Sequence, residues 1–141
     1  MPETDLRAHA VSALVALASS ERPADRRDAG VALTGFLDAE HAQAVLHDLV
    51  LDADDAVNRA VSAAVARRAD PHGWVVLVLA LATADESQQG AVREGVGEVV
   101  ETSDATRLQG AKTALRLHEH PEAAIREGAA RLLAILGAPA A

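Results

Sequence analysis

Residues 85–100 of this 141-residue chain, DESQQGAVREGVGEVV, combine a helix start with an apolar spacing that decides the fold class. Asp85 stands three residues before Gln88, a pattern similar to the capping box with which many helices begin. Valines then follow at intervals of three and four, which place them on one face of a helix: Val92, Val96, Val99 and Val100. The stretch therefore predicts an amphipathic helix with a buried valine face.

The same pattern recurs on both sides of this stretch. Val57 precedes Val92 by 35 residues, and Ile125 follows it by 33. The tetrapeptides that begin at Val92 and Ile125, VREG and IREG, differ at one position. Recurrence at a nearly fixed spacing is typical of repeat proteins, in which each unit buries its apolar face only against its neighbours.

Turn and capping signals divide the whole chain into helical segments. The expected helices are 4–19, capped by Thr4, then 23–37, 38–51, 52–69, 70–82, one that begins at Asp85, one that begins at Ser103, and 120–137. No segment keeps the period-two alternation of a strand. The sequence therefore predicts an all-α fold, an α-solenoid of about eight helices in four antiparallel pairs. The units of this single domain are about 1–38, 39–69, 70–101 and 102–141.

The composition excludes several classes of function and of binding site. Half of the residues are hydrophobic, but one Phe, one Trp and no Tyr leave the core to small aliphatic side chains. The absence of cysteine excludes disulfides and thiolate sites. A formal charge of -8 disfavours binding to nucleic acid, whose phosphates are bound mainly by Lys and Arg. The longest apolar run, 74–82, is too short to span a membrane, and the acidic start does not resemble a signal peptide, so a cytoplasmic protein is expected.

Two central helices have unusual compositions. Residues 73–81 are apolar on all sides, which predicts burial on all sides. The following helix contains Gly90, Gly95 and Gly97, each of which costs about 1 kcal/mol relative to Ala. We therefore expect that helix to be the weakest, or to be approached closely by another backbone.

Acidic loops followed by Val-Arg or its equivalent, and then by small apolar residues at helical spacing, carry a family resemblance: Asp55, Val57, Ala60, Val61, Ala64; Asp85, Val92, Arg93, Val96; Pro121, Ile125, Arg126, Ala129 and Leu132. This pattern resembles HEAT repeats, in particular the short HEAT-like units first recognised in phycobilisome lyases. Asn58 stands where the repeat has arginine, and the period is shorter than in standard HEAT units. The resemblance implies a structural ladder of inter-repeat hydrogen bonds, here Arg27, Asp54, Asp55, Asp85, Arg93 and Arg126.

The resemblance also implies that the second helix of each pair lines a concave surface. Wheel positions opposite the buried valines predict its residues: Arg59, Ser62, Ala63, Ala66, Glu94, Gly97, Glu98, Glu101, Glu127, Ala130, Arg131 and Ala134. Residues 23–37 are expected to add Asp28, Val31, Ala32 and Gly35. Unit 70–101 has six acidic residues and one basic, so this surface is expected to be acidic there. It is either a solvated face or a trough for a protein, a peptide or a basic, amphipathic helix.

No catalytic constellation accompanies this architecture. One His-Glu pair, His118 with Glu119, cannot supply the several pairs of a HEAT-like di-iron hydroxylase. HEAT-like DNA glycosylases need a basic, aromatic-lined face, and bilin handling would lack assistance from cysteine or tyrosine. We therefore expect a non-enzymatic scaffold or adaptor without metal or cofactor, and these three activities are the alternatives. The aliphatic first and last helices indicate a homodimer through a terminal helix as a further expectation.

Overall fold

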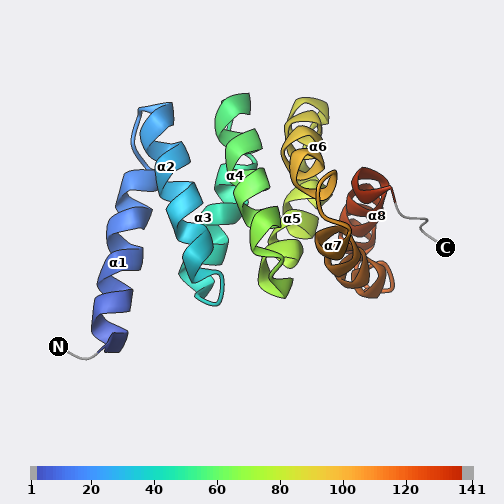
Figure 1. Cartoon of the computed structure of the whole chain (residues 1–141). Coiled ribbons are helices and arrows are strands. Elements are labelled where there is room, and N and C mark those ends of the chain that lie inside the picture. The colour runs from blue at the N-terminus through green and yellow to red at the C-terminus, as the bar shows by residue number, and fades with distance from the viewer. Residues whose placement is uncertain (1–2, 138–141) are drawn as a thin grey trace.

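The computed structural model describes residues 3–137, and these form eight α-helices and one 3-10 turn without any β-strand. The predicted all-α class is confirmed. The helices, shown in Figure 1, are α1 (Glu3–Ala18), α2 (Pro23–Leu33), α3 (Glu40–Val50), α4 (Asp55–Arg68), α5 (Pro71–Thr83), α6 (Glu86–Val100), α7 (Asp104–Leu117) and α8 (Ala123–Leu136). The 3-10 turn η1 (Thr34–Phe36) follows α2 directly.

Four predicted helix starts are confirmed by side-chain caps. Asp54 accepts hydrogen bonds from the first turn of α4, Asp70 from that of α5, and Ser103 from that of α7. Asp85 and Gln88 form the reciprocal capping box of α6. These side chains satisfy backbone N–H groups that have no partner within the helix, which is why short polar residues mark helix starts in the sequence.

Three predicted boundaries are wrong. The helix that begins at Pro23 ends at Leu33 and not at residue 37, because η1 replaces its last turn. Asp38 does not cap α3, which has Ala39 at its N-cap, since the Asp38 carboxylate binds Arg7 instead. The last helix begins two residues after Pro121, with Glu122 at the N-cap position but without a side-chain capping bond. The predicted cap at Thr4 lies outside the side chains that the structure describes.

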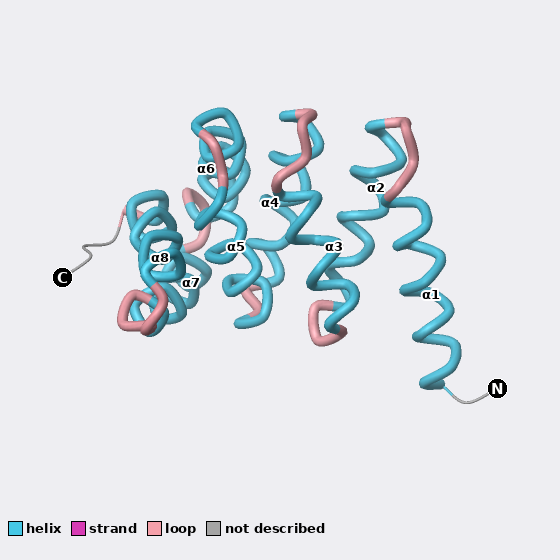
Figure 2. Tube along the Cα trace, turned by 180° about the vertical axis from the view of Figure 1, so that it is seen from behind, coloured by secondary structure: helices cyan, strands magenta, loops and turns pink. Residues whose placement is uncertain are grey.

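The helices pack in two rows. In one row, α4 lies between α2 and α6, and in the other, α5 lies between α3 and α8, with α1 beyond α3 and α7 against α5 and α8. Figures 1 and 2 show the two rows from opposite sides. The expected third pair is not a closely packed hairpin, because α6 packs chiefly on α4 while α5 packs chiefly on α8.

Two glycines explain this arrangement. Gly95 of α6 lies directly against the carbonyl oxygen of Arg59 in α4, and Gly128 of α8 lies in the same way against the carbonyl oxygen of Val78 in α5. A Cβ at either position would overlap with that oxygen, so only glycine permits these crossings. The repeated VREG and IREG tetrapeptides therefore mark two close backbone contacts between helices.

The core is aliphatic and continuous between the rows. Val57 and Val92 are buried as predicted, whereas Ile125 is half-buried. Trp74 is the largest buried side chain, and its ring packs against Gly110 of α7. The prediction that residues 73–81 are buried on all sides is wrong for one edge of α5, because Leu79 is 39% exposed. Leu79 lines a depression of about 270 Å³ between α5 and α3, together with Val75 and His47 among others.

Candidate binding surface

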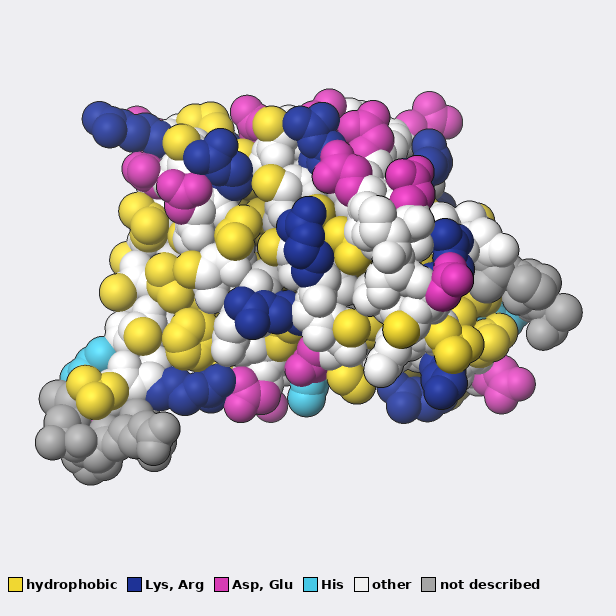
Figure 3. All heavy atoms as spheres, in the orientation of Figure 1, with side chains coloured by type: hydrophobic (Ala, Val, Ile, Leu, Met, Phe, Trp, Pro, Cys, Tyr) yellow, Lys and Arg dark blue, Asp and Glu magenta, His cyan; other side chains and the backbone are white. Residues whose placement is uncertain are grey.

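The row α2–α4–α6 presents one face, here called the front face, which is turned to the viewer in Figures 1 and 3. Figure 3 shows acidic side chains gathered over α6, basic side chains over α4, and hydrophobic side chains over α1 and α2. The sequence predicted an acidic stripe on this face. Its carboxylates, Glu94, Glu98 and Glu101, are exposed at i, i+4 and i+7 along α6.

Arg59 is the predicted front-face residue that links the first two charged zones. Its Nη1 lies 3.4 Å from Oε2 of Glu94, and both side chains are about half or more exposed, at 47% and 66%. An ion pair at this exposure contributes little to stability, because water screens both charges. Arg59 and Glu94 therefore remain accessible to a partner.

Three residues assigned to this surface are in fact buried. Ser62, Ala63 and Ala66 of α4 are 0%, 3% and 0% exposed. The wheel treated this side of α4 as solvent-facing, but α6 packs onto it, with the Gly95 contact beside the backbone N of Ala63. Partner contact through these three side chains is excluded in the folded chain.

The α8 residues assigned to the surface do not continue it either. Glu127 and Ala134 are exposed, while Ala130 and Arg131 are half-buried. Arg131 donates to the carbonyl of Leu81 at the end of α5 and to Glu127 at 3.2 Å. Because α8 packs on α5 in the other row, the front face ends at α6. Gly97 of α6, by contrast, is half-exposed with open space around it.

A depression of about 340 Å³ lies between α2 and α4 on the front face, and the two arginines of its rim are not among the residues predicted for this surface. Val31, Ala64 and the buried Thr34 form its floor, and Arg67 and Arg68 at the end of α4 form its rim. Of the residues expected from 23–37, Val31 is 43% exposed and takes part directly. The signal for the site was the Arg67–Arg68 pair itself, because a helix C-terminus favours basic residues and exposes them.

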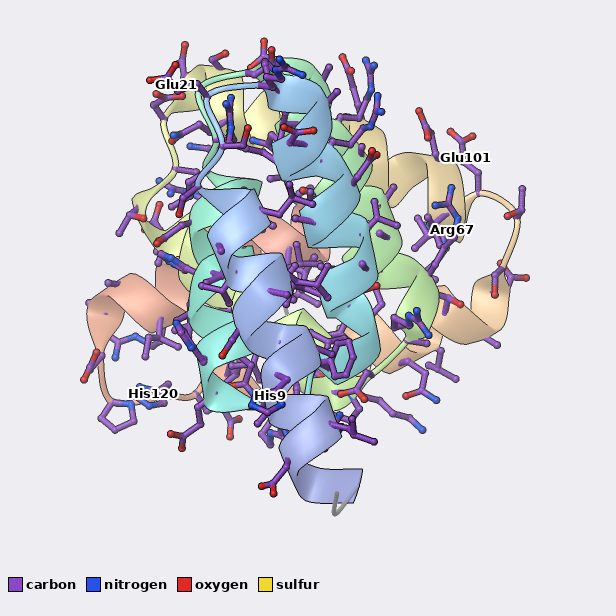
Figure 4. All side chains as sticks on the ribbon, turned by 90° about the vertical axis from the view of Figure 1, so that its left-hand side faces the viewer. His9, Glu21, Arg67, Glu101 and His120 are labelled. Atoms are coloured by element: carbon purple, nitrogen blue, oxygen red, sulfur yellow. The ribbon has the colours of Figure 1, made fainter. Side chains whose placement is uncertain are left out.

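Figure 4 shows that Arg67 and Glu101 project from the same side of the molecule, whereas His120, in the loop before α8, lies on the opposite side. The front face therefore carries both charge signs. Arginines lie over α4, and carboxylates over α6.

The predicted ladder is present only in part. Asp55 accepts a hydrogen bond from the Ser87 hydroxyl at 3.3 Å and so connects the first turns of α4 and α6. Asp54 and Asp85 act as helix caps instead. Arg27 pairs with its neighbour Asp28 at 3.2 Å, and so does not link units.

Arg26, one residue earlier, forms the link that was assigned to Arg27. It donates to both carboxylate oxygens of Asp52, at 2.9 and 3.1 Å, and its bond to that carboxylate raises the pKa of the guanidinium. Arg26 also donates to the carbonyls of Ser20 and Glu21. Helix α2 is thereby fixed to the loop before α4.

Arg93 and Arg126 have no role between units in the described part of the chain. Arg126 donates to the carbonyls of His120 and Pro121, at 2.8 Å each, within its own loop. Arg93 is exposed beside a small depression between α6 and α8. The two arginines of the repeated tetrapeptides therefore make different contacts, whereas the two glycines make equivalent ones.

Amide side chains replace the missing arginine contacts between α4 and α6. Asn58, at the position where the HEAT pattern has arginine, is completely buried and donates to the carbonyl of Gln88 at 3.3 Å. Gln88 in turn donates to the carbonyl of Leu51 at 2.9 Å, and the Ser62 hydroxyl donates to the Asn58 amide oxygen at 3.1 Å. The Asn58 bond thus joins α4 to α6, the Gln88 bond joins α6 to the end of α3, and the Ser62 bond orients Asn58 within α4.

Other depressions lie away from the front face. One, of about 410 Å³, lies between α1 and α3 and is lined by Arg7, Val11, Glu40 and His41 among others. Arg7 is already paired with Asp38 and lies 5.1 Å from the ring centroid of Phe36. Within residues 3–137, no three His, Asp or Glu side chains come together as a metal site, and no helix is long and apolar enough to cross a bilayer.

Comparison with known proteins gives little. No family model matches the chain, and no curated protein matches it. Among solved structures it is similar to the crystal structure of an engineered protein, with 18% sequence identity and a TM-score of 0.41. That similarity covers 92% of this chain, which spans 63% of the engineered protein.

Proposed function

We propose that this chain is a non-enzymatic scaffold of HEAT-like units that binds a segment of a partner protein on its front face. The observation that carries the proposal is a charged face of both signs beside a depression with an apolar floor, built on a rigid helical row. Grooves of this kind accept an amphipathic helix, whose apolar residues fill the depression and whose charges select the partner.

The acidic stripe on α6 is the part of the front face that would bind basic residues of the partner. Glu98 and Glu101 have no ion pair within the described residues, and Glu94 has only the exposed contact with Arg59. Carboxylates at i, i+4 and i+7 lie in a row along α6, so a basic stretch of a partner helix can align with them. This half of the face accounts for the expected preference for a basic, amphipathic segment.

Charge reversal tests the proposal. A partner recovered with the wild-type chain is titrated against a variant with Glu94, Glu98 and Glu101 changed to Lys, and we expect affinity to fall by about tenfold or more, equivalent to about 1.4 kcal/mol. A matched control reverses three exposed carboxylates elsewhere, Glu21, Glu119 and Glu122. Equal affinity for the reversed and wild-type chains would refute the assignment of the front face.

A specific observation also favours self-association through the first helix. Leu6 and Leu17 of α1 are 58% and 39% exposed at the end of the stack, where terminal repeats usually present polar residues. We propose a weak homodimer through α1. Light scattering over a range of concentrations should show a dimer that Leu6→Glu with Leu17→Glu abolishes, and a mass that stays monomeric at every concentration would refute it.

A further inference from the structure

The α2–α4 depression differs from the rest of the front face in the chemistry that it offers. Arg67 and Arg68 line it side by side, although the chain as a whole has 21 acidic and 13 basic residues. Val31 supplies an apolar contact at its floor, and Ala64 keeps that floor low because its side chain is small. Guanidinium groups above an apolar floor are complementary to a segment that carries both carboxylates and an aliphatic side chain.

The two arginines are available to a ligand. Arg7, Arg26, Arg59 and Arg131 each bind a carboxylate, whereas Arg67 and Arg68 form no ion pair among the described residues. Arg67 is exposed and makes no described hydrogen bond at all. Its position on the last turn of α4 keeps it beside the depression without a competing acidic residue.

Arg68 is held in place for binding. Its Nε donates to the Thr34 hydroxyl at 3.3 Å, and that hydroxyl donates to the Val31 carbonyl at 2.6 Å. The terminal nitrogens of Arg68 form no described hydrogen bond, and Nη2 lies beside Gly35, where an added Cβ would come within 3.7 Å of it. An oriented guanidinium with free terminal nitrogens can bind a carboxylate with two parallel hydrogen bonds.

We propose that this depression binds an acidic, amphipathic segment of the partner, with carboxylates on Arg67 and Arg68 and one aliphatic side chain on Val31. The inference rests on the proposed scaffold function and adds the partner's chemistry at the α2–α4 side of the same face. A segment with acidic residues at one end and basic residues at the other fits both zones. The helix dipole favours a partner helix whose acidic residues lie at its N-terminus and whose basic residues lie at its C-terminus.

The alternative ligand, a nucleic-acid strand, fits the face less well. A strand that extends from the arginines across the front face would meet Glu94, Glu98 and Glu101 on α6. The formal charge of -8 adds repulsion along the rest of its length. A peptide can instead change its charge from one residue to the next.

The test uses three labelled probes with the full chain. They are helical peptides of about 15 residues, long enough at 1.5 Å per residue to cross two helices, with leucines on one face flanked by Glu, Gln or Lys. Fluorescence anisotropy measures affinity, and amide chemical shifts locate the bound peptide. We expect the Glu peptide to bind about tenfold more tightly than the Gln peptide, with the shifts at Val31, Thr34 and Gly35.

Variants then identify the arginines as the cause. Arg67→Glu should weaken the Glu peptide by about tenfold or more, since its side chain makes no described contact whose loss could unfold the chain. Arg68→Gln, which also removes the bond to Thr34, should weaken it too. Arg22→Glu, an exposed arginine before α2, is the matched control and should leave affinity unchanged.

The outcomes separate this inference from the scaffold proposal. Binding of the Lys peptide at α6 without binding of the Glu peptide would overturn the inference and leave the scaffold intact. Failure of all three peptides would count against both. Tighter binding of a short single-stranded oligonucleotide than of the Glu peptide, lost in Arg67→Glu, would overturn the acidic-segment assignment in favour of phosphate.

Discussion

The backbone of α6 touches the backbone of α4 where Gly95 meets the carbonyl oxygen of Arg59. Gly128 of α8 makes the equivalent contact with Val78 of α5. Each glycine lies in the last position of a repeated tetrapeptide, so the repeat specifies a helix crossing as well as a buried face. This distinguishes them from Gly90 and Gly97, around which there is open space.

Gly95→Ala and Gly128→Ala should therefore destabilise the chain. Alanine gains about 1 kcal/mol in helix propensity, but overlap with a backbone oxygen forces the helices apart, at a cost of about 1–3 kcal/mol or more. The net loss should appear as a lower urea midpoint. Gly97→Ala is the control and should raise stability by up to about 1 kcal/mol, since nothing opposes its side chain. A gain at Gly95 equal to that at Gly97 would contradict the crossing.

Much of the fold could be predicted because its signals are local. The polar caps at Asp54, Asp70 and Ser103 act within one turn, and the apolar periodicity follows from burial of one helix face. The choice of neighbours is not local. Helix α6 packs on α4, and α8 on α5, where Gly95 and Gly128 contact the backbone of those helices. The position of a glycine within a helix does not indicate which other helix will pack against it.

Loss of the Asn58 side chain should lower the free energy of unfolding, because this side chain is completely buried and hydrogen-bonded. Asn58→Ala leaves the Gln88 carbonyl and the Ser62 hydroxyl without their partner, and an unsatisfied buried group costs about 1–3 kcal/mol. Denaturation of Asn58→Ala, Ser62→Ala and the double variant forms a thermodynamic cycle. We expect a smaller loss in the double variant than the sum of the single losses, and strict additivity would show that the two side chains do not interact.

The binding surface was harder to predict than the fold. The wheel placed Arg59, Glu94, Glu98 and Glu101 correctly in solvent but failed at Ser62, Ala63 and Ala66, where small residues permit close packing as readily as they serve a solvated face. Arg67 and Arg68 were not predicted as surface residues because the depression that they line also needs Val31 of α2, which is far away in sequence. A charge pattern on one helix does not reveal the groove beside it.

The ion pair of Arg7 and Asp38 should shift the titration of the Asp38 carboxyl to lower pH, although both side chains are too exposed for the pair to add much stability. The hydrogen bond from Arg7 lowers the pKa of the Asp38 carboxyl, so the pair contributes above the ordinary pKa of an aspartate and is lost as pH falls through the folded-state value. An NMR titration should place the pKa of the Asp38 carboxyl below the usual value of an aspartate, and Arg7→Gln should raise it. Identical titration curves would show that the pair does not form in solution.

The buried Nε1 of Trp74 allows a test of how an unpaired donor affects the stability of the core. Its side chain is buried between α5 and α7, yet its Nε1 has no hydrogen-bond partner among the described residues. Trp74→Phe loses ring volume but also removes a buried donor whose desolvation costs about 1–3 kcal/mol, so the two effects oppose each other. We expect a smaller loss than for Leu77→Ala, a buried residue of the same helix, for which about 2–5 kcal/mol is usual. Urea unfolding followed by circular dichroism measures both variants, because the Phe variant has no tryptophan fluorescence. A loss as large as that of Leu77→Ala would mean that Nε1 is satisfied in solution, with a buried water as its acceptor.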